Sequence, residues 1–324
     1  MITCIDAFKN LNILNQNNSL ALSPCCYSPS EKVEIIDFKN NTYLNRVRSS
    51  WLTEKFPSAC SACNKSEQQG YNSRRIGSNQ WYQDHNKYNT DIELIRLDYW
   101  TGEQCNLRCA ICGPHNSSAW KEELKLDVKK SSINRFWKEL DLSKLKFIHF
   151  NGGEPLLSKE HVAFLHAIPD KSQVAINYNT NGTVLPTKNL RNLWEEFQLV
   201  QLDFSIDDIE DRFEYQRYPA KWAKVTENLQ WYIDNSPVNC MFAVNTTVSV
   251  LNYANLDNLN VWLKTNFNAN RVTDPIEHRQ QPASGLFSIK NKKLTTGMIQ
   301  FLNACDQRRG TDWQQTFPEL RQSE

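Results

Sequence analysis

From residue 91 onward, short apolar segments alternate with segments of helical periodicity, and this alternation limits the fold more than any other feature. A strand, a loop and a helix in repeated order imply parallel strands joined by right-handed crossovers, which is an α/β architecture. Strands are predicted at 92–98, 146–150, 174–178, 199–206 and 238–248, with 285–289 as the candidate for a sixth. Helices are predicted from residue 117, and at 132–140, 159–168, 187–197, 220–233, 256–267 and 295–308.

Unusual polar motifs follow these strands at the points where the strands end. In a β/α barrel, the chemical groups gather at the carboxyl ends of the strands. We therefore expect the motifs to form one site, although a helix cap or a surface salt bridge is the alternative for each single polar residue. The motifs are the cysteine-rich residues 105–112, the Gly152-Gly153-Glu154 loop, Asn181-Gly182, Ser205-Ile206-Asp207 and Asn245.

The first of these motifs holds Cys105, Cys109 and Cys112 in a C-x3-C-x2-C spacing. Thiolates are soft ligands that suit an iron–sulfur cluster, zinc or copper(I). Electron-transfer clusters take four cysteines, so three in a short loop hold three corners of a cubane and leave one iron open. Half of a zinc site and incidental cysteines are the alternatives.

This spacing resembles the signature of the radical S-adenosylmethionine (radical SAM) enzymes. The resemblance implies a partial (β/α)6 barrel, with SAM chelated to the open iron of a [4Fe–4S] cluster. It also implies reductive cleavage of SAM to a 5′-deoxyadenosyl radical that takes a hydrogen atom from the substrate. A peptide or protein substrate is favoured over a small molecule or nucleoside. The resemblance further implies an electron donor such as flavodoxin or ferredoxin.

The same resemblance assigns cofactor contacts residue by residue. Ile111 stands where the family usually has an aromatic residue beside the adenine, and Gly152, Gly153 and Glu154 resemble its GGE motif for the methionine ammonium. Arg217 is expected on the SAM carboxylate, because a guanidinium fork suits that group, and Arg212 competes for the role. The remaining expected contacts, to ribose, carboxylate or substrate, are Asn181, Ser205, Asp207 and Asn245.

Five more cysteines, Cys4, Cys25, Cys26, Cys60 and Cys63, precede the predicted barrel. Their order resembles the SPASM and Twitch modules of radical SAM enzymes, which carry auxiliary clusters and in most members follow the barrel. The resemblance implies a second [4Fe–4S] cluster on Cys4, Cys25, Cys60 and Cys63, with Cys26 as a substitute for Cys25. A structural zinc site uses the same thiolates, and incidental cysteines remain a further alternative.

The chain of 324 residues is long enough for a barrel with an appendage. We expect an auxiliary module at 1–90, the barrel at 91–290 and a helical extension at 291–324. A net charge of +1 gives no support to nucleic-acid or membrane binding. The N-terminus lacks a signal-peptide pattern, so the cysteines indicate metal in a reducing cytoplasm rather than disulfides. A non-catalytic Fe–S or zinc scaffold is the rival class of function.

Overall fold

The computed structural model describes residues 3–16, 19–53, 55–128, 135–266, 277–283, 285–291 and 293–323. The chain forms two compact units. Unit 1 comprises residues 1–102, 129–177 and 196–199, and unit 2 comprises 103–128, 178–195 and 200–324. Among the described residues, no helix is both long enough and apolar enough to cross a membrane.

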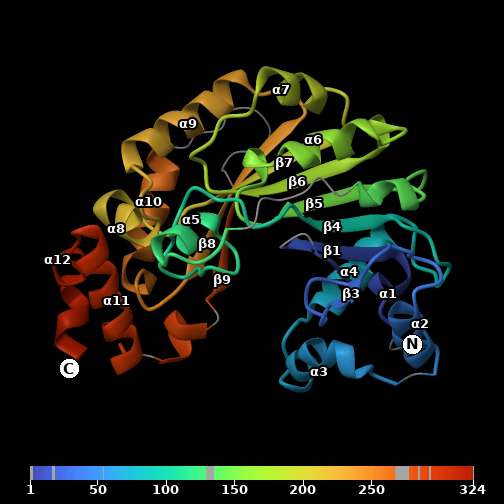
Figure 1. Ribbon diagram of the computed structural model, residues 1–324, viewed down its shortest axis with the longest axis horizontal. Coiled ribbons are helices and arrows are strands. Elements are labelled where there is room, and N and C mark those ends of the chain that lie inside the picture. Colours follow the sequence, from blue (N-terminus) through green and yellow to red (C-terminus); the bar gives the residue numbers. More distant parts are fainter. Residues whose placement is uncertain are drawn as a thin grey trace. The chain divides into compact units, whose positions relative to one another are not determined.

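The sheet of unit 1 begins with an antiparallel meander and continues as parallel strands (Figure 1). Its strand order is β3-β2-β1-β4-β5, followed by the start of β6. The parallel part begins where β1 pairs with β4, with Asn10 opposite Arg96 and Leu14 opposite Trp100. The strands are β1 (Asn10–Gln16), β2 (Ser19–Ser23), β3 (Glu31–Val33), β4 (Arg96–Trp100), β5 (Phe147–Asn151) and β6 (Ala175–Thr180).

Alternating side chains divide β4 and β5 between an apolar and a polar face. Tyr99 and Phe150 are fully buried and belong to an aromatic core that includes Phe164 of α6. Asp98 and His149, which are register partners, occupy the other face. The α-helices of unit 1 are α1 (Asp6–Lys9), α2 (Thr42–Leu52), α3 (Ser61–Gln68), α4 (Arg74–Asp84) and α6 (Lys159–His166).

Unit 2 continues the alternation of strand and helix. Its strand order is the end of β6, then β7 (Leu199–Ser205), β8 (Cys240–Val248) and β9 (Glu277–Pro282). β7, β8 and β9 pair in parallel. The α-helices are α5 (Ser118–Glu123), α7 (Lys188–Trp194), α8 (Glu210–Gln216), α9 (Trp222–Asn235), α10 (Leu256–Asn266), α11 (Thr296–Arg309) and α12 (Trp313–Thr316).

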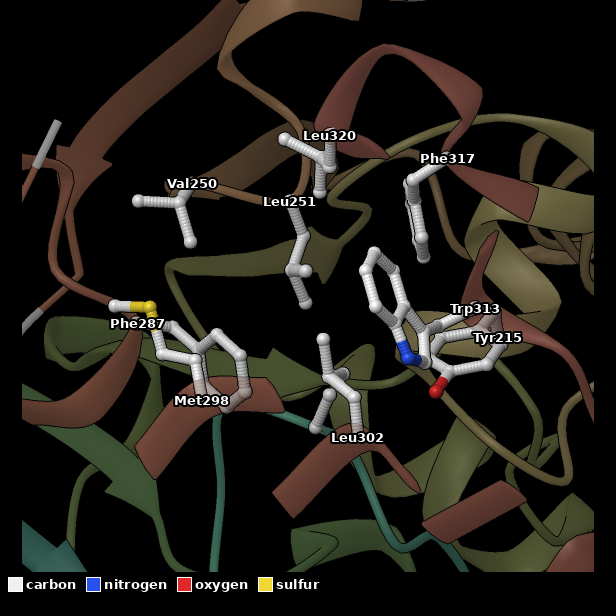
Figure 2. Close-up of a cluster of buried hydrophobic side chains, with 10 residues drawn as sticks. Tyr215, Val250, Leu251, Phe287, Met298, Leu302, Trp313, Phe317 and Leu320 are labelled. Atoms are coloured by element: carbon white, nitrogen blue, oxygen red, sulfur yellow. The ribbon is translucent and has the colours of Figure 1, made fainter. Parts of the chain in front are cut away.

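A buried apolar cluster fastens the last helices of the chain to the rest of unit 2. Figure 2 shows Leu302 of α11 and Trp313 of α12 converging on Leu251, with Tyr215 of α8 beside Trp313. Ala110 of the cysteine loop is buried in the same cluster. The C-terminal helices therefore support the loop that carries the three barrel cysteines.

The predicted α/β fold with parallel strands is confirmed, and the five main predicted strands appear close to their expected positions. The sixth was wrong, because residues 285–287 form a 3-10 turn and β9 at Glu277–Pro282 takes the sheet position. The helix predicted at 132–140 is described only in part, as a 3-10 turn at Phe136–Glu139. The domains predicted at 1–90, 91–290 and 291–324 stay a prediction.

Candidate functional site

Hydroxyl and indole groups from the start of α5 hold the barrel cysteine loop of unit 2. Ser117 Oγ donates to the Leu107 carbonyl at 2.6 Å, and Ser118 Oγ bonds both the carbonyl (3.1 Å) and the amide (3.1 Å) of Cys105. Trp120 Nε1 donates to the Cys109 carbonyl at 3.0 Å. Ser117 also caps α5 by accepting from the Trp120 amide. The loop backbone is thus fixed by a short helix that follows it in sequence.

A second segment, after α8, lies against the same loop. The Arg108 amide donates to the Tyr218 carbonyl at 2.6 Å, and the Ala110 amide donates to the Gln216 carbonyl at 2.7 Å. Arg217 stands between the two acceptors in sequence. Its guanidinium interacts electrostatically with both Cys109 and Cys112. The pairing therefore brings a cation to the cysteines from about a hundred residues away.

The three barrel thiols lie close enough to influence one another. Burial raises the pKa of the Cys109 thiol, and Cys112 and Cys105 raise it further, whereas Arg217 opposes the rise. Burial also raises the pKa of Cys112. The raised pKa values keep these thiols protonated when no metal is bound. Metal binding requires thiolates, so a bound metal would replace the thiol protons. Within the described ranges, no group of three or more His, Cys, Asp or Glu is placed so that it could hold a single metal ion.

Arg217 is buried and only partly committed. Its Nη2 lies 2.8 Å from Asp207 Oδ2, and the other carboxylate oxygen of Asp207 accepts from the Thr247 amide at 2.8 Å. Burial raises the pKa of Asp207, and Arg217 works against that rise. The buried Nε of Arg217 has no hydrogen-bond partner among the described residues. A buried donor without an acceptor is costly, so this atom favours a ligand oxygen beside Cys109 and Cys112.

Arg212, the competitor for that role, is used in the structure of unit 2 itself. It forms ion pairs with Asp208 at 2.9 Å and Glu319 at 2.8 Å, and it donates to the Leu251 carbonyl at 2.8 Å. Its guanidinium also lies over the Phe317 ring. These contacts tie the C-terminal residues to α8. They leave Arg217 as the arginine that interacts with the cysteines.

Amide side chains connect the cysteine loop with the end of β6. Asn181 Nδ2 donates to Asn106 Oδ1 at 3.0 Å, and Asn106 Nδ2 donates to Thr183 Oγ1 at 2.8 Å. Thr183 in turn donates from its amide to Asn181 Oδ1 at 2.9 Å. Asn106 lies between the first two cysteines of the motif, so these bonds place Asn181 at the loop.

The other predicted contacts at the ends of β7 and β8 lie together. Ser205 and Asn245 are register partners in the parallel pairing of these strands. Asn245 Nδ2 donates to Asn179 at 3.2 Å and to Asp203 at 3.3 Å, while its buried Oδ1 has no partner among the described residues. Ile111 is half-buried and packs against the apolar cluster of Figure 2.

The Gly152-Gly153-Glu154 loop belongs to unit 1. Gly152 has a φ of +132°, and a Cβ atom at this position would lie 2.6 Å from the Gly102 carbonyl oxygen and 3.0 Å from Thr101 Oγ1. The Gly153 amide donates to that same carbonyl at 2.9 Å. Only glycine fits here, and Glu154 is thereby buried at the start of a 3-10 turn. Gly152 brings the loop against the backbone that leads into the cysteine motif.

Four of the five N-terminal cysteines line one pocket in unit 1. Cys4, Cys25, Cys60 and Cys63 surround it. Burial raises the pKa of Cys4 well above its ordinary value, and the neighbouring Asp6, Cys25 and Cys60 raise it further. Cys26 is exposed and instead accepts from Arg74 Nη1 at 3.2 Å. Cys25 therefore faces the other thiols, whereas Cys26, the alternative ligand that the sequence suggested, does not line the pocket.

The side-chain network behind this pocket was missed by sequence reasoning. Arg74 forms ion pairs with Asp6 at 3.2 Å and with Asp98 at 2.7 Å, and His149 Nδ1 lies 3.4 Å from Asp98. Burial raises the pKa of Asp98, but Arg74, His149 and Arg96 together outweigh burial and hold that pKa well below its ordinary value. An acidic residue inside an apolar strand, Leu97-Asp98-Tyr99, was the available signal.

The sequence comparisons agree with the motifs. A sequence model of the radical SAM superfamily matches residues 101–258, which include the three barrel cysteines and the glycine loop. Residues 101–258, just under half of the chain, are thus similar to the radical SAM superfamily. This family implies a [4Fe–4S] cluster and SAM, and the three coupled thiols and the uncommitted Nε of Arg217 fit these groups. The N-terminal cysteines lie outside the matched residues.

Curated relatives match this chain over half of its length or less. A protein of Clostridium perfringens named GTP 3′,8-cyclase is 27% identical over 168 residues, which is 50% of this chain and 48% of that protein. A protein of Methanocella arvoryzae named probable GTP 3′,8-cyclase is 31% identical over 130 residues, covering 40% of this chain and 39% of that one. The chain thus spans about half, or less, of the relatives it matches.

Solved structures with a limited likeness to this chain have also been found. Native anSMEcpe with bound AdoMet has a TM-score of 0.42 and 15% identity, covering 61% of this chain and 56% of that chain. SuiB of Streptococcus suis bound to S-adenosylmethionine has a TM-score of 0.44 and 14% identity, covering 95% of this chain and 74% of that chain.

Proposed function

We propose that this chain is a radical SAM enzyme. When bound, the [4Fe–4S] cluster and SAM supply a 5′-deoxyadenosyl radical that abstracts a hydrogen atom from the substrate, chemistry that belongs to the cofactors. The protein contributes binding, orientation and exclusion of water. Because the comparisons cover only part of the chain and of its relatives, the complete activity is a proposal.

One observation carries this proposal. Three thiols of a C-x3-C-x2-C loop interact with one another and with a buried arginine that keeps an unpaired Nε. Cys105, Cys109 and Cys112 would hold the cluster, and Arg217 would bind the SAM carboxylate. Asp207 would then serve to orient Arg217 rather than to meet the substrate, since it is buried in the ion pair.

Further cofactor roles follow from the placement of the polar side chains. Asn181, Ser205 and Asn245 would bind ribose or carboxylate oxygens, and the open acceptor of Asn245 suits a hydroxyl group. Ile111 would cover the adenine. Gly152, Gly153 and Glu154 would bind the methionine ammonium, because Glu154 is buried directly after the glycine-dependent turn and its carboxylate can accept from an ammonium group.

For the substrate, we propose a peptide or protein, as the family resemblance in the sequence suggested. The named relatives act on GTP by their names, so a nucleotide is the second candidate. An electron donor such as flavodoxin or ferredoxin and a cytoplasmic location complete the proposal. Separate incubations with a peptide pool and a nucleotide pool distinguish the two candidates, because the pool that contains the substrate changes the yield of 5′-deoxyadenosine.

We also propose an auxiliary [4Fe–4S] cluster on Cys4, Cys25, Cys60 and Cys63. These four thiols line one pocket, in which each is a soft ligand for iron. Burial raises the pKa of Cys4, Cys25 and Cys60, so these neighbouring thiols stay protonated until a metal replaces their protons. Arg74 and Arg75 line the same pocket, where they pair with Asp6, Asp98 and Glu67. A zinc ion on the same thiols is the rival.

The experiment is anaerobic reconstitution with iron and sulfide, followed by SAM and dithionite. We expect 5′-deoxyadenosine from the native chain and none from Cys109→Ala. Cys240→Ala is the matched control, because Cys240 is buried in β8 and lies outside the cysteine loop. Equal product from both variants would sink the proposal, and no product from a native chain that binds iron and SAM would favour the non-catalytic scaffold.

A further inference from the structure

An open pocket of about 750 Å³ adjoins the N-terminal cysteine pocket in unit 1. It lies within the size range of small-molecule sites. The two pockets share Tyr27, Cys63 and Arg74 as a common wall. Trp81 and Arg96 form another part of the lining, and no Asp or Glu side chain takes part in it. The pocket is therefore positively charged and partly aromatic, and it touches one of the proposed cluster ligands.

Among the residues that the structure describes, Arg96 is the cation of this pocket that forms no ion pair. Its guanidinium carbon lies 4.7 Å from the centre of the Trp81 ring and 4.8 Å from that of Phe147. Stacking on aromatic faces holds a guanidinium without using its hydrogen-bond donors. The buried Nε has no acceptor among the described residues, and Arg96 forms no ion pair there. Asp98, two residues along β4, interacts with it only through the longer-range field.

The second arginine of the pocket, Arg74, is already neutralised. It pairs with Asp6 and Asp98, which lie behind it and are both buried. Arg74 also begins α4, whose first turn contributes Ser73, Gly77 and Ser78 to the pocket and carries no acidic residue. The amino end of a helix favours anions. The local field therefore adds to the unpaired charge of Arg96 instead of cancelling it.

We propose that this pocket binds a carboxylate group of the substrate, with Arg96 as the anchoring residue. The inference rests on the proposed function, since it assigns the substrate of that same enzyme to a class. A guanidinium fork binds a carboxylate through two parallel hydrogen bonds. Trp81 and Tyr27 offer apolar and aromatic surface for the body of the ligand. The bound group lies beside Cys63, and so beside the proposed auxiliary cluster.

Charge favours a carboxylate over a nucleotide triphosphate. One arginine is uncommitted in the pocket, and a carboxylate carries one negative charge, whereas a triphosphate carries several. Lysine side chains are absent from the lining. Each anionic oxygen that finds no partner in a half-enclosed site costs free energy. The site therefore suits a group with one negative charge, such as a peptide C-terminus or an acidic side chain, better than a triphosphate.

The test uses the reconstituted full chain without SAM and follows trifluoroacetate binding by ¹⁹F NMR line broadening. We expect binding by the native chain, and binding at least about tenfold weaker in Arg96→Met, the effect of losing charge-assisted hydrogen bonds. Arg46→Met is the matched control. It removes the same charge from an exposed arginine of unit 1 that lies outside the pocket, in a 3.5 Å pair with Glu31.

Competition identifies the oxyanion. A short peptide with a free C-terminus should displace trifluoroacetate, and the same peptide with an amidated C-terminus should not. Displacement by GTP or inorganic phosphate at lower concentration than by the peptide would overturn the carboxylate assignment. Unchanged binding in Arg96→Met would overturn the site. If that variant fails to fold by circular dichroism, Arg96→Lys, which keeps the charge and loses the fork, must still weaken binding.

These readouts do not depend on SAM cleavage. Formation of 5′-deoxyadenosine is measured separately on the same preparations. Loss of trifluoroacetate binding in Arg96→Met supports the anion site whatever the yield of 5′-deoxyadenosine from that variant. A native chain that binds the probe but forms no 5′-deoxyadenosine would refute the proposed function and leave the anion site standing.

Discussion

The sharpest structural prediction concerns Gly152→Ala. The residue has a φ of +132°, which side chains with a Cβ rarely adopt, and the new Cβ would lie 2.6 Å from the Gly102 carbonyl oxygen. Backbone strain of this kind costs about 1–3 kcal/mol, and overpacking against atoms that cannot rotate away costs about another 1–3 kcal/mol. We therefore expect the free energy of unfolding to fall by about 2–6 kcal/mol.

The assay is urea unfolding followed by tryptophan fluorescence, with Gly77→Ala as the matched control in unit 1. Gly77 lies in α4, and a Cβ there meets nothing within 4 Å. Alanine in a helix interior is favoured over glycine, so this control should gain about 0.5–1 kcal/mol. The reasoning is supported if the urea midpoint falls in Gly152→Ala and rises in Gly77→Ala. A loss below about 1 kcal/mol for Gly152→Ala would refute it, because the turn would then tolerate a side chain.

Two further predictions concern iron content and pH. The native chain should bind about eight irons after reconstitution and Cys63→Ser about four, since four thiolates hold one [4Fe–4S] cluster. Cys26→Ser should keep all of the iron, because Cys26 faces Arg74. A native chain with about four irons and one zinc would contradict the second cluster. Burial lowers the pKa of His161 from 6.5 to about 4, so the unfolded state takes up the proton first as the pH falls. The free energy of unfolding should therefore drop by up to about 1.4 kcal/mol for each pH unit between these values. His161→Gln should lose this pH dependence when urea titrations at pH 7 and pH 5 are compared. An unchanged pH dependence in the variant would show that other groups cause it.

The sequence by itself determined the features that depend on neighbours along the chain. The parallel strands and most helices were predictable, because the periodicity of apolar residues follows directly from the geometry of each element. The cysteine motif was readable for the same reason, since its three ligands lie within one loop. The need for glycine at Gly152 was visible as a motif, although its cause, the Gly102 carbonyl, was not.

The tertiary structure alone decided the choices between residues that looked alike in sequence. Arg217 rather than Arg212 lies against the cysteines, because the backbone of Arg108 and Ala110 pairs with the segment around it. Cys25 rather than Cys26 faces the other N-terminal thiols. The parallel pairing of β1 with β4 and the counter-ion state of Arg96 were equally out of reach. These outcomes depend on contacts between residues far apart in the chain, which local spacing and composition do not encode.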